Sequence, residues 1–127
     1  MSYVPKYIMK RLIPQDAVKA VEGGVEISVV NVISPIPADQ IPGDHADIID
    51  IKINGKDMSK EDKNKVTIDI DGKKIMFPNF VEAGTVPVGS KILFFFPTTE
   101  YKKGDEITVV LSVSIVNVNI EFTRTIM

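Results

Sequence analysis

The chain has 127 residues, of which 44% are hydrophobic and 25% charged, with a formal net charge of -2. These values exclude a disordered or collagen-like chain and predict one globular domain over residues 1–127. Neither nucleic acid nor a membrane is an expected partner, because there is no strong positive charge and no stretch of about 18 apolar residues.

Cysteine is absent. This absence excludes disulfides, thiolate metal ligands and cysteine nucleophiles. The first ten residues also lack the apolar core of a signal peptide, so a cytoplasmic location is expected.

The N-terminal third contains one clear strand pattern and two weaker ones. Residues 6–13 predict an edge strand, and residues 15–21 are the best candidate for two helical turns. From Val25 the apolar side chains alternate, and their phase shifts by one residue at Val29 and Val30. A shift of this kind predicts a β-bulge or a strand that passes between two sheets.

Residues 34–46 form the longest stretch without a strand pattern. Pro35, Pro37 and Pro42 cannot donate to a sheet ladder, so we expect an extended or turn-rich loop that also contains Ile41. Long ordered loops on compact domains are often functional, which makes this loop a candidate interface.

His45 is the only histidine of the chain, and Asp44 and Asp47 flank it. Such a group could bind a metal or transfer a proton, but catalytic zinc typically takes three protein ligands and the sequence does not supply the others. A solvated loop histidine is therefore favoured, and a contribution of His45 to a partner's site stays open.

Three short strands are predicted in the middle of the chain. Residues 49–53 end at Asn54-Gly55, and residues 66–70 end at Asp71-Gly72, which joins them to residues 73–77 as a hairpin. Between them, Ser59 and Asp62 form an imperfect capping box that could start one helical turn.

The strand predicted at residues 91–96 is apolar on both faces. Ile92, Phe94 and Phe96 form one face, and Leu93 and Phe95 form the other. Apolar side chains on both faces predict cover on both, either from this domain or from another chain. Leu93, Phe95 and Phe96 are therefore candidate interface residues.

Residues 98–106 are predicted to turn into a long final strand, which should pair antiparallel with residues 91–96. The alternation of the final strand shifts by one residue at Ile115 and Val116, as it does at Val29 and Val30. We expect a bulge or a sheet crossing there, and the matching shifts make these two long strands candidate neighbours.

The strand spacing predicts an all-β fold. We expect an antiparallel, immunoglobulin-like β-sandwich with seven to eight strands and at most one short helix, although the marker cysteines and tryptophan are absent.

No residue pattern predicts chemistry within the chain. Asp50 and Asp69 occupy the polar phase of their strands, the glycines lack phosphate-loop spacing, and the serines lack a nucleophile elbow. We therefore predict no catalytic residue, no metal site and no cofactor in this chain.

The order of the motifs resembles the small β subunits of C-glycoside deglycosidases over about residues 25–118. The similar segments are residues 29–33, the proline-containing loop, residues 47–56 with their Asn54-Gly55 turn, residues 66–77, the strand near Leu93 and residues 102–106. The sequence departs from the family pattern after residue 118.

The resemblance implies a β-sandwich accessory subunit bound to a larger barrel subunit related to sugar isomerases. In that family the larger subunit holds a divalent metal and abstracts a proton from an oxidised sugar. It implies no catalytic residue in this chain, which would stabilise and shape the partner's substrate entrance.

Two functions from different classes follow. The first is a non-catalytic accessory subunit of a hetero-oligomeric enzyme, whose protein partner is a larger catalytic subunit. A homo-oligomer of this chain is the other assembly expected. The alternative is a free-standing small-ligand or carbohydrate-binding module that uses the loop at residues 34–46 and Tyr3, Tyr7 and Tyr101. A third hypothesis is an independent lyase or hydrolase, whose mechanism would depend on His45 and the acidic residues of the loop.

Overall fold

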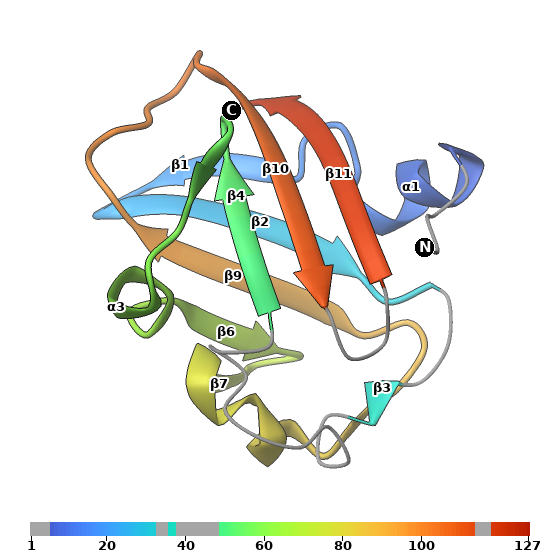
Figure 1. Cartoon of the computed structure of the whole chain (residues 1–127). Helices are drawn as coiled ribbons and strands as arrows, with labels where there is room; N and C mark the ends of the chain where they lie inside the picture. The colour runs from blue at the N-terminus through green and yellow to red at the C-terminus, as the bar shows by residue number, and fades with distance from the viewer. Residues whose placement is uncertain (1–5, 33–35, 38–48, 114–117) are drawn as a thin grey trace.

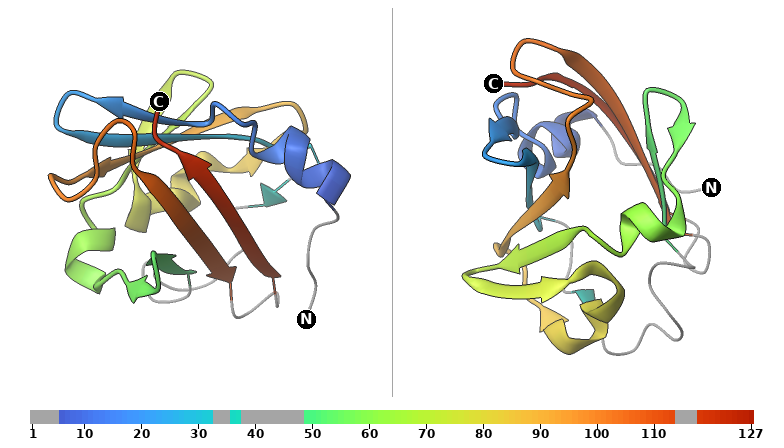
Figure 2. Two further views of the ribbon diagram at one scale, coloured as in Figure 1. Left: turned by 90° about the horizontal axis from the view of Figure 1, so that it is seen from above. Right: turned by 90° about the vertical axis from the view of Figure 1, so that its left-hand side faces the viewer.

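The computed structural model describes residues 6–32, 36–37, 49–113 and 118–127 (Figure 1). Two antiparallel sheets face each other in a mostly β, sandwich-like architecture (Figure 2). The five-stranded sheet has the order β1-β2-β9-β6-β7, and the four-stranded sheet has the order β11-β10-β4-β5. The prediction of an antiparallel, mostly β fold is confirmed.

The strands of the five-stranded sheet are β1 (Val18–Val21), β2 (Gly24–Val30), β9 (Lys91–Pro97), β6 (Thr67–Ile70) and β7 (Lys73–Met76). Those of the four-stranded sheet are β11 (Val118–Thr125), β10 (Glu106–Val113), β4 (Ile49–Ile53) and β5 (Lys56–Asp57). A separate two-stranded ladder joins β3 (Ile36–Pro37) to β8 (Thr85–Val86). The helices are α1 (Lys6–Leu12), α3 (Lys60–Lys63) and the 3₁₀ helix η2 (Phe77–Ala83).

The core lies between the two sheets because the apolar phase of each strand points inward. In the five-stranded sheet Val25 pairs with Phe96 and Ile27 with Phe94, while in the four-stranded sheet Val109 pairs with Phe122. Apart from the half-buried Phe94, all of these side chains are buried, and Phe94 packs against them. Alternation therefore predicted the inward side chains of β2, β4 and β10 correctly.

The hairpin at Asp71-Gly72 forms as predicted, and the predicted turn at Asn54-Gly55 joins β4 to β5 in a second hairpin. Asn54 and Asp71 both take positive φ, of 53° and 50°, and each is followed by a glycine with positive φ. Successive positive φ angles are what a two-residue turn needs to match the twist of paired strands. The predicted cap also forms, because Ser59 Oγ accepts a hydrogen bond from the Asp62 N–H at 3.1 Å.

The prediction of an edge strand at residues 6–13 is wrong, because this segment contains α1. Helical spacing places the half-buried Ile8 and the buried Leu12 on one face and leaves Lys10 and Arg11 exposed in the last turn. Basic residues there interact favourably with the helix dipole. Helices at α1 and η2, in addition to α3, also exceed the predicted maximum of one.

The predicted helix at residues 15–21 is wrong as well, because this segment contains β1. Its residues pair with β2 on one side, and the Ala20 N–H donates to the Met127 carbonyl on the other at 3.0 Å. Backbone partners on both sides, one of them distant in sequence, outweigh a weak local helical pattern.

The long final strand is in fact two strands. β10 pairs antiparallel with β11 in a register that joins Val113 to Val118, so the chain reverses between them. The phase shift at residues 115–116 falls outside the described residues. The shift at Val29 and Val30 produces no break in the ladder, since β2 pairs continuously with β9 from Gly24 to Val30.

Two predicted strand pairings are wrong. β9 does not pair with β10, because β9 lies between β2 and β6 in one sheet while β10 lies between β4 and β11 in the other. For the same reason β2 is not a neighbour of the C-terminal strands. Residues 98–105 therefore cross from one sheet to the other, and this crossing forms one wall of a cavity between the sheets.

Candidate functional site

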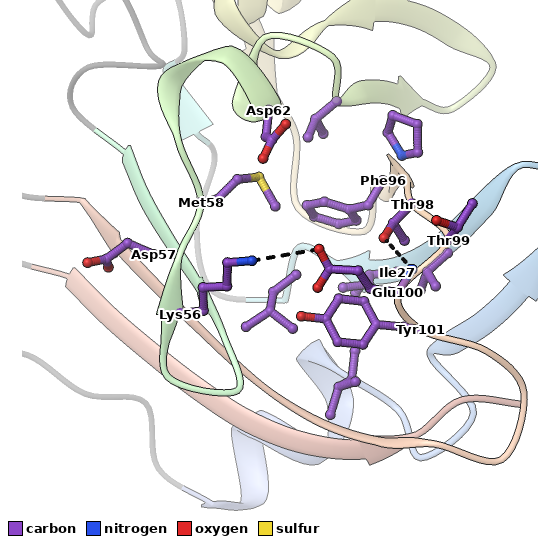
Figure 3. Close-up of a pocket in the computed structure, with 15 residues that line it drawn as sticks. Ile27, Lys56, Asp57, Met58, Asp62, Phe96, Thr98, Thr99, Glu100 and Tyr101 are labelled. Carbon is purple, nitrogen blue, oxygen red and sulfur yellow. Dashed lines mark hydrogen bonds and ion pairs between the residues drawn. The ribbon is translucent and has the colours of Figure 1, made fainter.

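A cavity of about 280 Å³ opens at one end of the sandwich, between the two sheets (Figure 3). Its floor belongs to the hydrophobic core and takes side chains from both sheets. These are Val25, Ile27 and Phe96 from the five-stranded sheet, Ile53 and Ile107 from the four-stranded sheet, and Val66 just before β6. A ligand that entered the cavity would therefore meet an apolar interior.

Two chain segments form the mouth of this cavity, and one ion pair joins them. Lys56 lies on the β4–β5 hairpin and Glu100 on the crossing segment, with 3.7 Å between Nζ and Oε1. Both side chains are largely exposed, at 74% and 59%. An ion pair with this exposure is weak, so it can open without a large cost in stability.

The hairpin that carries Lys56 is held rigidly to its own sheet. The Asn54 N–H donates to the Thr108 carbonyl at 2.8 Å, and the Thr108 N–H donates to Asn54 Oδ1 at 2.9 Å. This reciprocal pair fixes the turn against β10. The position of Lys56 over the mouth thus follows from the Asn54-Gly55 turn.

Glu100 and Tyr101 form the opposite wall. The Glu100 N–H donates to Thr98 Oγ1 at 3.1 Å, which orders the crossing segment. Burial raises the pKa of the Tyr101 hydroxyl, and the charge of Glu100 and a hydrogen bond with its carboxylate raise it further. The hydroxyl therefore stays protonated at neutral pH and donates to the carboxylate.

Two aspartates complete the rim, and they differ in orientation. In Figure 3 the Asp57 carboxylate points away from the cavity, and it pairs with Lys52 at 3.9 Å. Asp62 points toward Met58 and the interior, and its backbone is fixed by the Ser59 cap. Glu100 and Asp62 are therefore the two carboxylates that face the cavity.

A second surface lies on the outer face of the five-stranded sheet, and we call it the outer apolar face. It consists of Val30, Met76, Leu93 and Phe95. In the sheet register Phe95 lies between Glu26 and Thr67, and Leu93 lies between Ser28 and Asp69.

Leu93 and Phe95 are half-exposed and do not belong to the core, while Met76 is 41% exposed. The outer apolar face is thus an apolar centre with a polar border.

The structure separates the predicted interface residues. Pro35, Ile41 and His45 lie outside the described residues. Pro37 lies in β3 and is opposite Thr85 in the ladder, although the prolines of this segment were expected to prevent any ladder. Leu93 and Phe95 lie on the outer apolar face.

Phe96 was grouped with Leu93 and Phe95, but it points the other way. Its side chain is 5% exposed and lines the floor of the cavity. It therefore cannot contribute to the outer apolar face. Among the described residues, Phe96 is buried on its face of β9, whereas Leu93 and Phe95 are only half-buried on the other.

The cavity itself was not predicted, although Tyr101 was singled out. The alternating pattern of residues 107–113 indicated which side chains point inward but not which sheet they belong to. Because β9 was expected to pair with β10, residues 98–105 were interpreted as a simple turn. Only the crossing between sheets brings Glu100 opposite Lys56.

In the described part of the chain, no three His, Cys, Asp or Glu side chains lie close enough together to hold a metal ion. Within those same residues, no helix is long and apolar enough to span a membrane. Comparison of the chain with family models, with curated proteins and with solved structures finds no match.

Proposed function

We propose that this chain is a non-catalytic accessory subunit that binds a larger protein through the outer apolar face. The observation that carries the proposal is the half-exposed pair Leu93 and Phe95 at the centre of a sheet, surrounded by Glu26, Ser28 and Asp69. An apolar centre with a polar border is the usual composition of a protein interface.

The resemblance to the small β subunits of C-glycoside deglycosidases supports the same proposal and suggests the kind of partner. That partner would be a larger barrel subunit with its own divalent metal, and this chain, in an immunoglobulin-like strand arrangement, would contribute no metal ligand. A second copy of the chain is the other partner that the outer apolar face could accept.

The experiment is co-expression with the protein encoded by the neighbouring gene, followed by sedimentation analysis of the purified complex. We expect a stoichiometric complex that Phe95→Glu abolishes, because a buried unpaired carboxylate is costly. Val110→Glu is the matched control, since Val110 is the half-exposed apolar residue on the outer face of the other sheet. It should leave the complex intact.

Two results would count against the accessory role. One is a chain that stays monomeric at every concentration and with every neighbouring gene product. The other is a complex that tolerates Phe95→Glu but is lost with Val110→Glu. Because the chain has no cysteine, a single Leu93→Cys substitution would also give a unique cross-linking site within the proposed interface.

A second candidate function is supported by the cavity between the sheets, which would make the chain a small-ligand-binding module. The specific observation is an apolar floor that opens to solvent beside Lys56, Glu100 and Tyr101. The carbohydrate version of this function has less support, because Tyr101 is half-buried and its hydroxyl is engaged with Glu100. Tyr3 and the Tyr7 side chain lie outside what the structure describes.

A further inference from the structure

We infer that the cavity between the sheets binds a small molecule with a compact apolar body and a single ammonium group. This inference rests on the second candidate function above and is independent of the accessory role. It adds the chemical class of the ligand, which follows from the size of the cavity, the apolar floor and the charges at the mouth.

The size of the cavity limits the apolar part of the ligand. A cavity of roughly 150 Å³ is enough to hold benzene, and this one is about 280 Å³. One aromatic or alicyclic ring with a short arm therefore fits, whereas a disaccharide or a long acyl chain does not. The ring would lie on Phe96 and the β-branched side chains of the floor, and Met58 can adapt to its outline.

The charges at the mouth select the polar end of the ligand. One cation, Lys56, and two acids, Asp62 and Glu100, face the cavity, so these groups sum to a charge of -1. Asp57 points away and pairs with Lys52. A carboxylate or phosphate group would be repelled, and an ammonium group would be attracted. Tyr101 cannot reverse this preference, since its hydroxyl stays neutral and donates to Glu100.

The chain itself indicates where an ammonium group would bind. The Nζ of Lys56 lies 3.7 Å from Glu100 Oε1, at the entrance of the cavity. Because Lys56 is 74% exposed, it can swing into solvent and leave the carboxylate to a ligand. Asp62, which points inward in Figure 3, is the second acceptor within the described residues.

The test uses three probes of similar shape that differ in charge: 2-phenylethylamine, 2-phenylethanol and phenylacetate. Each is titrated into the isotopically labelled chain at neutral pH, and backbone NMR shifts are followed at Lys56 and Glu100, with Thr123 as the remote reference. We expect the amine to bind with a Kd on the order of a millimolar. The alcohol should bind about fivefold more weakly and phenylacetate not measurably.

Variants of the mouth make the test specific. Glu100→Gln and Asp62→Asn should each weaken amine binding by up to about fivefold and leave the alcohol unchanged. Lys56→Met removes the competing ammonium group and should strengthen amine binding several-fold. Glu121→Gln is the matched control, because it changes the net charge by the same amount as Glu100→Gln but lies on the outer face of the four-stranded sheet.

The outcomes separate this inference from the function on which it rests. If the amine and the alcohol bind equally, or Lys56→Met has no effect on the amine, the ammonium specificity is wrong and the cavity is a nonselective apolar site. If none of the probes shifts the resonances of the cavity residues, both the ammonium specificity and the small-ligand function are wrong. Shifts that are larger at Thr123 than at Glu100 would overturn the location.

Discussion

The outer faces of the two sheets differ in chemistry, although their inner faces are equally apolar. On the four-stranded sheet Asp50 and Lys52 point outward, and Thr108 and Thr123 share a hydroxyl hydrogen bond of 2.8 Å. On the five-stranded sheet the equivalent central positions are Leu93 and Phe95. A fold of two packed sheets needs apolar side chains on its inner faces, while its outer faces can be polar. Folding therefore does not require the apolar outer face of the five-stranded sheet.

The inner faces provide the largest expected effect and the baseline for this comparison. Ile51 in the four-stranded sheet is 1% exposed and Ile27 in the five-stranded sheet is 3% exposed. Truncation of either to alanine should lower the free energy of unfolding by about 4 kcal/mol, because a cavity replaces packed atoms. Urea denaturation measures this loss.

Lys52→Ala is the control for the inner-face truncations, since Lys52 is adjacent to Ile51 but points outward. It should change stability by no more than about 0.5 kcal/mol. If Ile27→Ala were as mild as this control, the two sheets would not share one core.

The next largest effect concerns the close approach of β2 to β9, which builds the outer apolar face. A Cβ at Gly24 would collide with the carbonyl oxygen of Phe96, whereas a Cβ at Gly72 would meet nothing. Gly24→Ala should therefore cost about 3 kcal/mol, at the upper end for overpacking, because backbone cannot move aside as a side chain can.

Gly72→Ala tests the alternative that any glycine substitution is equally harmful. Gly72 has a φ of 95°, so alanine there is strained but not blocked, and a loss of about 1 kcal/mol is expected. Equal losses at Gly24 and Gly72 would contradict the close approach. Thermal unfolding of both variants under the same conditions gives the comparison.

Local features of the fold could be predicted from the sequence, and long-range ones could not. The turns at Asn54-Gly55 and Asp71-Gly72 and the cap at Ser59 depend on neighbouring residues alone, and all three form as expected. Alternation also separated Phe94 and Phe96 from Leu93 and Phe95. Alternation defines a face, however, and contains no information about the neighbouring strand.

The errors have this same origin. β1 forms because its backbone meets β2 and the Met127 carbonyl, neither of which a local pattern can reveal. The apolar repeat after residue 106 was interpreted as one strand because the chain reversal lies between β10 and β11 without a Gly-containing turn. The cavity was missed for a related reason, since its walls meet only when residues 98–105 connect opposite sheets.

Substitution of Phe95 on the outer apolar face should change the stability little and the hydrophobicity of the surface strongly. Phe95→Thr keeps β propensity and removes an aromatic side chain that the core does not use, so stability should change by only about 0.5 kcal/mol. Retention on a hydrophobic-interaction column should fall clearly. Val110→Thr on the four-stranded sheet should leave both quantities nearly unchanged, and a larger drop in retention for Val110→Thr would reverse the assignment of the binding face.

The smallest expected effect is the pH dependence contributed by Tyr101, at the end of the sandwich where the two sheets are joined. Because burial and Glu100 raise its pKa above the ordinary value of 10.0, the folded state holds the proton more tightly than the unfolded state. The resulting stability is fully present below the unfolded pKa and is lost as pH rises through the folded pKa. Wild type should therefore lose more stability in alkali than Tyr101→Phe does.

Ultraviolet titration of the phenolate, taken as the difference between these two proteins, measures the pKa of Tyr101 directly. Glu100→Gln should lower the pKa of Tyr101 only part of the way, since the contribution of burial remains. A phenolate that ionises at the ordinary pKa in wild type would mean that the Tyr101 hydroxyl is neither buried nor in contact with Glu100.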